Sequence, residues 1–129
     1  GNPLAMTAGL VTLRRLGAPG VFDATAARTQ TLLDGLLSAL RAAEIPATGT
    51  AVGTMFGVFF RADPVQDHAG AAACDTACFA RFHAAMLSEG VYLAPSAFEA
   101  GFVSTAHDAA AIDATIAAAQ ESARVAAAG

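Results

Sequence analysis

One stretch of the chain, residues 48–61, differs in residue type from the alanine-rich sequence around it. Threonine, valine, methionine and phenylalanine predominate there, and all of these except methionine favour β-strands. The pair Gly53-Thr54 marks a turn between two strands. The second strand is apolar on both faces, with Met55, Gly57 and Phe59 on one and Phe56, Val58 and Phe60 on the other. We therefore expect it to be covered on both sides, by helices of this chain and by protein outside it.

The sequence before this hairpin begins with a helix. Asn2 can cap it, and Pro3 suits its first position, where the missing N–H is not needed. The pattern predicts a helix over residues 3–16. Its leucines, methionine and valine surround most of the circumference, so we expect this helix to be largely buried.

A second helix is predicted from about residue 23 to residue 43. Asp23 is its expected cap, and Phe22 could act as a hydrophobic staple before it. Pro46 ends the element, because the residue before a proline is pushed out of the helical region.

After the hairpin, residues 62–73 contain proline, aspartate and glycine and are predicted to form a loop. A helix is expected from about residue 75 to residue 89, ended by Gly90. The last helix should start at the cap Asp108, and the alanine-rich tail after Arg124 should fray.

Two further short apolar pieces, residues 91–93 and 102–103, are predicted strands. The order of elements predicts an α+β fold, an antiparallel sheet of three or four short strands with helices packed on one face. At 129 residues the chain is expected to form a single domain, with residues 1–20 as a leading helix and residues 21–129 as the α+β core.

Composition narrows the class of function. The chain is 55% hydrophobic and 14% charged, but charged residues, glycine or proline interrupt every apolar run, so we expect no membrane span. A net charge of −4 without a basic cluster argues against nucleic acid as a partner. Two cysteines without a secretory signal favour a reducing compartment, the cytoplasm.

The most informative carboxylate is Glu99. It is the only charged residue between Gly90 and His107, and it is flanked by Phe98 and Phe102. A carboxylate in apolar surroundings needs a partner or has a function, so Glu99 is our candidate catalytic residue, held where apolar walls exclude water. The alternative is a loop carboxylate that caps a nearby N–H.

Other polar side chains are weaker candidates. Cys74, Cys78, His68 and His83 could suggest a metal site, but their spacing differs from that of zinc knuckles, and we favour buried or half-buried thiols. His107 is interpreted as a capping or turn residue rather than a catalytic one. We assign no metal ligand and no cofactor-binding residue.

Three stretches resemble the glutamate-1-semialdehyde 2,1-aminomutase family, which belongs with the class III aminotransferases. They are residues 1–6 (GNPLAM), residues 52–60 (VGTMFGVFF) and residues 92–107 (YLAPSAFEAGFVSTAH), in the order that the family has them. The likeness covers the last third or so of the family's length. It implies the C-terminal small domain of a fold-type-I pyridoxal-phosphate enzyme, which makes 5-aminolevulinate for tetrapyrroles.

The resemblance places Glu99 in the active site, near the cofactor and the substrate amines. It also implies a homodimer, a small-molecule substrate and pyridoxal phosphate held as a Schiff base on a lysine. All seven basic residues of this chain are arginines, so that lysine is expected in a longer protein of which this chain is a part. Two alternatives remain: a related class III aminotransferase, whose loop usually offers an arginine, and an interaction domain without catalysis.

Overall fold

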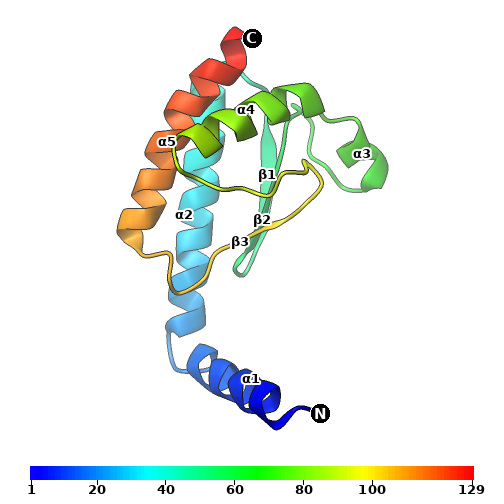
Figure 1. Ribbon diagram of the computed structural model, residues 1–129. Helices are drawn as coiled ribbons and strands as arrows, with labels where there is room; N and C mark the ends of the chain where they lie inside the picture. The colour runs from blue at the N-terminus through cyan, green and yellow to red at the C-terminus, as the bar shows by residue number, and fades with distance from the viewer.

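The computed structural model describes residues 1–129. Five helices and three strands follow in the order α1 (Pro3–Leu16), α2 (Val21–Ala42), β1 (Thr48–Val52), β2 (Met55–Phe59), α3 (His68–Ala72), α4 (Thr76–Ser88), β3 (Gly101–Phe102) and α5 (Ala109–Ala128). The strands form one antiparallel sheet in the order β1-β2-β3, and α2 and α5 run side by side next to it (Figure 1). The predicted α+β class is confirmed.

The hairpin forms as its residue types predicted. Val52 pairs with Met55, and Gly53 between the strands has a φ of +59°, which glycine adopts without strain. Phe56 on the second strand and Phe60 just after it face the helices and are buried. Met55 is exposed, so the other face of this strand is not fully covered within the chain.

The predicted strand at residues 91–93 is wrong, because this segment has no strand partner. The Val91 N–H donates to the carbonyl of Met86 at 2.9 Å, and the Leu93 carbonyl lies 3.1 Å from Nε2 of His83. The segment is thus bonded to α4 rather than to the sheet. The prediction for residues 102–103 is nearly right, since β3 consists of Gly101 and Phe102 and pairs with β2.

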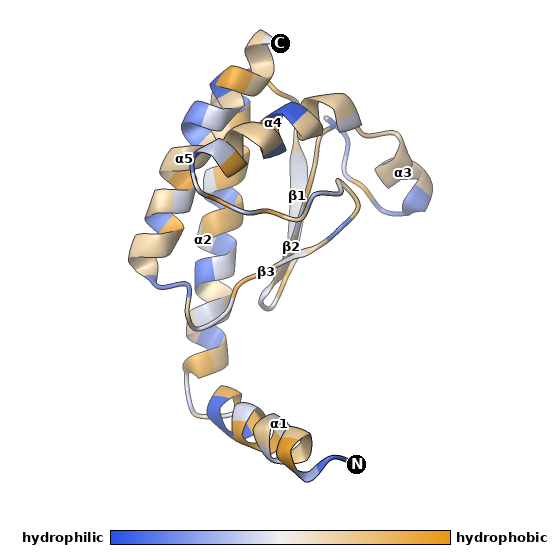
Figure 2. Cartoon of the chain, in the orientation of Figure 1, coloured by the Kyte–Doolittle hydropathy of each residue, from blue (hydrophilic) through white to orange (hydrophobic).

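The core lies between the sheet and three helices. Leu40 of α2, Met86 of α4 and Ala119 of α5 are fully buried. Small residues let α2 and α5 approach closely: a Cβ atom added at Gly35 would lie 2.5 Å from the side chain of Ile116. The alanines of α5 therefore serve as packing residues, although their hydropathy alone is modest (Figure 2).

The end of α5 is ordered, and the prediction that it frays is wrong. Ala126 is fully buried, and Nε of Arg81 donates a hydrogen bond to its carbonyl at 3.0 Å. This contact from α4 satisfies one of the carbonyls that a helix leaves free at its C-terminus, and it places a positive charge at the negative end of the helix dipole.

The first helix forms where predicted but is not buried. Asn2 caps it, since Oδ1 accepts a hydrogen bond from the Leu4 N–H at 2.9 Å. Leu4 is 79% exposed and Leu13 is 69% exposed, and no residue of α1 is buried. The helix extends away from the rest of the chain with its apolar side chains uncovered (Figures 1 and 2). The prediction of burial is therefore wrong for this chain.

Two local predictions also need correction. The second helix starts at Val21, with Gly20 as its cap in a left-handed conformation, so Asp23 lies in the first turn and Phe22 is part of the helix. The expected loop at 62–73 contains α3, which Asp67 caps by accepting from the Gly70 N–H at 2.7 Å. Gly20 suits this cap position because glycine adopts a positive φ without strain.

Helix α2 ends in a left-handed residue that is not glycine. The Ile45 N–H donates to Leu40 O at 2.9 Å and the Glu44 N–H to Arg41 O at 3.0 Å, which is the pattern of a Schellman motif. Glu44 has a φ of +58°. Helix α4 ends in the same way, but there the left-handed position is held by Gly90, with a φ of +83°.

Replacing Glu44 with glycine should raise the free energy of unfolding by about 1 kcal/mol, because a side chain in this conformation costs about 1–2 kcal/mol and glycine returns part of that in the unfolded chain. Gly90→Ala should lower it by a similar amount. Urea unfolding followed by circular dichroism checks both. A Glu44→Gly midpoint at or below that of the wild type would contradict the assignment.

Candidate functional site

Glu99 lies in the segment between α4 and β3. Its side chain is exposed and has no hydrogen-bond or ion-pair partner in the chain. The expectation that apolar walls of this chain shield it from water is therefore wrong. The capping alternative is not found either, because Ser96 accepts both nearby N–H groups: its carbonyl bonds Glu99 at 3.2 Å and its hydroxyl bonds Phe98 at 3.2 Å.

The segment carries Glu99 to a place with hollows on both sides of the sheet edge. One hollow of about 420 Å³ lies between the segment and α5, and Tyr92, His107 and Thr115 line it together with Glu99. Another of about 180 Å³ lies on the outer face of the hairpin, between Phe59 and Phe98. An uncompensated carboxylate beside apolar hollows can attract an ammonium group and repel anions.

His107 is a turn residue, as interpreted from the sequence. Its Nδ1 accepts a hydrogen bond from the Ser104 N–H at 2.9 Å and lies 3.2 Å from the Ser104 hydroxyl. The backbone N–H of His107 donates in turn to the Ser104 carbonyl at 3.1 Å. Asp108, the next residue, caps α5 through the Ala111 N–H at 2.9 Å.

The four residues considered as metal ligands do not gather at one point. Cys74 is half-buried and its Sγ lies 3.7 Å from the Gly70 carbonyl, while Cys78 is buried in α4. Burial raises the pKa of the Cys78 thiol, and nearby Arg81 only partly opposes this. No group of three or more His, Cys, Asp or Glu side chains is placed to hold a metal ion.

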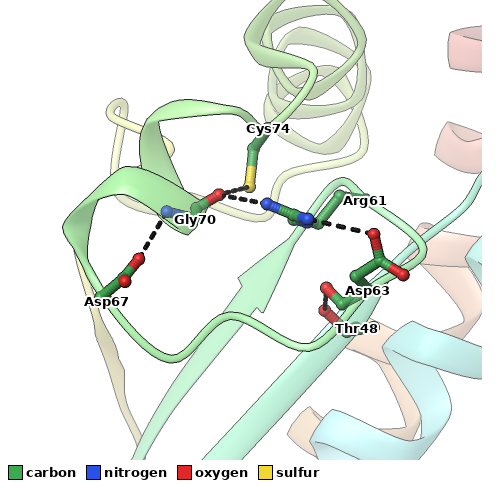
Figure 3. Close-up of polar contacts among 6 residues, drawn as sticks. All are labelled: Thr48, Arg61, Asp63, Asp67, Gly70 and Cys74. Carbon is green, nitrogen blue, oxygen red and sulfur yellow. Dashed lines mark hydrogen bonds and ion pairs between the residues drawn. The ribbon is translucent and has the colours of Figure 1, made fainter.

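A polar cluster that the sequence did not point to holds the loop after β2 (Figure 3). Arg61 donates from Nη1 to the Gly70 carbonyl at 2.9 Å and from Nη2 to the Asp63 carboxylate at 3.1 Å. Thr48 on β1 donates to the Asp63 carbonyl at 3.4 Å. Both ends of the guanidinium are thus occupied, which makes this cluster a structural anchor for the loop and α3.

The sequence comparison finds a protein that carries the name of the family resembled above. A glutamate-1-semialdehyde 2,1-aminomutase from Laribacter hongkongensis is 54% identical over 121 residues, which are 94% of this chain and 28% of that protein. No family model matches the chain. No helix of the structure combines the length and the apolar character that crossing a membrane would require.

Two solved structures share the fold. An omega-transaminase from Sphaerobacter thermophilus matches with a TM-score of 0.82 and 27% identity, over 98% of this chain and 28% of that one. The internal aldimine form, with PLP, of the FumI protein from Sphingopyxis sp. MTA144 matches with a TM-score of 0.72 and 23% identity, over 92% of this chain and 26% of that one.

The chain spans little more than a quarter of the length of each of these proteins. Each of the two structural matches extends over 92% or more of this chain. In sequence, this chain is thus similar over almost all of its length to part of a glutamate-1-semialdehyde 2,1-aminomutase, and it has the fold of the matching part of a transaminase.

Proposed function

We propose that this chain is the C-terminal part of a pyridoxal-phosphate-dependent isomerase, a glutamate-1-semialdehyde 2,1-aminomutase. The full-length enzyme would convert glutamate 1-semialdehyde to 5-aminolevulinate for tetrapyrrole biosynthesis in the cytoplasm. The observation that carries this proposal is the 54% identity to a protein of that name over 94% of the chain. This chain would contribute one wall of the active site and would be inactive alone.

The residues of this chain do not fit covalent attachment of the cofactor. Enzymes of this type hold pyridoxal phosphate through a lysine amine, and the seven basic residues here are all arginines. The cofactor and its lysine would therefore belong to the rest of the polypeptide, and we assign no step of the reaction to a cofactor bound by this chain.

Mixing the 129-residue chain with pyridoxal phosphate should yield no imine on any side chain, because no lysine amine is present to form it. Borohydride reduction followed by intact mass measurement checks this. The control is a chain acetylated at Gly1, whose α-amine could otherwise react. A cofactor mass fixed by borohydride on the acetylated chain would refute the argument.

Glu99 is the residue that we propose to act on the substrate. Nothing in this chain neutralises its carboxylate, which stands exposed beside the hollow that Tyr92 and His107 border. An ionised carboxylate only accepts hydrogen bonds, so it can hold the substrate's ammonium groups. It also disfavours a second, dicarboxylate substrate by repulsion.

Uncovered apolar surface supports a larger assembly. Leu4 and Leu13 on α1, and Val52, Phe98 and Phe102 around the outer face of the sheet, are each between 58% and 79% exposed. Large apolar patches usually mark interfaces. We propose that residues 1–20 are a leading helix and residues 21–129 the α+β core, and that the remaining polypeptide and a second subunit of a homodimer cover these surfaces.

Two other functions compete with this one. A class III aminotransferase is favoured by the transaminase fold, but Glu99 stands where such an enzyme usually offers an arginine to a substrate carboxylate. A binding domain without catalysis is compatible with the missing lysine. Neither alternative accounts for the identity to the aminomutase.

The test is to purify the full-length protein that contains this chain and supply glutamate 1-semialdehyde as the sole substrate. We expect 5-aminolevulinate to form without any added amino acceptor. The matched control is the same protein given an amino donor and 2-oxoglutarate. Efficient transamination without 5-aminolevulinate would favour the aminotransferase, and no reaction in either mixture would favour the binding domain.

A further inference from the structure

We propose that His83 is a positioning residue that fixes the segment carrying Glu99. Its Nε2 bonds the carbonyl of Leu93 at 3.1 Å, six residues before Glu99 in the chain. For its effect on catalysis this inference rests on the proposed role of Glu99. For its effect on the segment it rests on the structure alone.

Residues 92–100 have one hydrogen bond to the rest of the chain, and it is this one. Before them, the Val91 N–H donates to the Met86 carbonyl at 2.9 Å, and after them Gly101 begins β3. The other two bonds of the segment are internal, from the N–H groups of Phe98 and Glu99 to Ser96. Removing the His83 bond would leave the segment tied only at its two ends and by packing.

The ring of His83 is held in place by aromatic neighbours. Its centroid lies 6.0 Å from that of Phe79 on the same helix and 6.4 Å from that of Tyr92 in the segment. A carbonyl oxygen only accepts hydrogen bonds, so Nε2 must carry a hydrogen. The neutral ring with its hydrogen on Nε2 and the doubly protonated ring both meet this requirement. The bond therefore persists in either protonation state of the ring.

The position of Glu99 depends on how the segment is held, because its side chain has no partner of its own. Glu99 is exposed and unpartnered, so its position follows that of the segment backbone. Catalytic groups must be held close to their productive geometry, and a displacement of about 1 Å can cost up to about 10²-fold in rate. A single lost hydrogen bond is worth about 1 kcal/mol, or roughly fivefold in the population of displaced segments.

The first test uses the 129-residue chain and needs no activity. Tyr92 is the only tyrosine, and there is no tryptophan, so tyrosine fluorescence anisotropy reports on this segment alone. His83→Phe keeps a ring against its neighbours but lacks the donor, and we expect faster local motion of Tyr92 and roughly fivefold faster chymotryptic cleavage after Tyr92 and Phe98. His83→Gln keeps a donor near the place of Nε2 and should restore both.

The matched control is His68→Phe, the same substitution at an exposed position at the start of α3. It should leave Tyr92 anisotropy and cleavage unchanged, and thermal unfolding should confirm that each variant is folded. Equal anisotropy and cleavage rates in folded His83→Phe and wild type would overturn the proposal. So would a His83→Gln variant whose anisotropy and cleavage rate equal those of His83→Phe.

The second test measures turnover in the full-length protein. His83→Phe should lower kcat roughly fivefold with little change in KM, and His83→Gln should restore it. If His83 acts through Glu99, adding His83→Phe to Glu99→Gln should cost nothing further, whereas independent effects would multiply. A multiplied loss would overturn the positioning role. Absence of aminomutase activity in the wild type would instead refute the proposed function. The anisotropy and cleavage measurements would still test whether the His83 bond holds the segment.

Discussion

Replacing Glu99 with arginine in the full-length protein should slow isomerisation and raise transamination with 2-oxoglutarate. An aminotransferase exchanges partners and must bind a dicarboxylate keto acid, which a cation at this place favours. An aminomutase keeps its nitrogen on one skeleton, and a carboxylate excludes the keto acid by repulsion. Where the rest of the enzyme excludes water from this site, repulsion between like charges would reach several kcal/mol, on the order of 10²-fold or more in affinity. Both activities are measured side by side on each purified variant.

The neutral variant Glu99→Gln separates charge from size. It should lower aminomutase turnover, because the amide no longer holds the substrate's ammonium groups by charge. The matched control is Glu89, an exposed glutamate at the end of α4, where both substitutions should leave the two activities unchanged. Unaltered isomerisation together with no gain of transamination in either Glu99 variant would refute the proposal that Glu99 acts on the substrate.

Replacing Leu40 with alanine should lower the free energy of unfolding of the chain by about 2–5 kcal/mol, which is the usual cost of emptying a well-packed site. Leu40 is fully buried in the core between the helices and the sheet. Such a loss is a large part of the ~5–15 kcal/mol that stabilises an ordinary domain. Urea and thermal unfolding by circular dichroism give the difference directly.

The control for this prediction is the same substitution at Leu13 of α1, which is 69% exposed. Leu13→Ala removes almost no buried surface and should change the free energy of unfolding by less than about 0.5 kcal/mol. Similar losses for the two variants would mean that α1 packs against the core in solution.

Local chemistry made the starts of α1, α4 and α5 and the hairpin predictable from the sequence. Asn2, Asp75 and Asp108 cap α1, α4 and α5 as their side-chain types indicate, because a cap depends only on residues within one turn. Gly53 likewise marks the hairpin turn by its own conformational freedom. The four apolar stretches at helical spacing and the short strands were enough to place the α+β class.

Burial and pairing were decided only by the tertiary structure. Periodicity shows which side chains of α1 are apolar but not what covers them, and in this chain none of them is buried. Val91 and Leu93 have the residue types of a strand, but α4 supplies their hydrogen-bond partners, so no strand forms. Ala126 is buried, and Arg81 of α4 bonds its carbonyl, a contact that the periodicity of α5 does not show. The exposure of Glu99 and its dependence on His83 arise in the same way, from contacts between residues that the sequence alone does not pair.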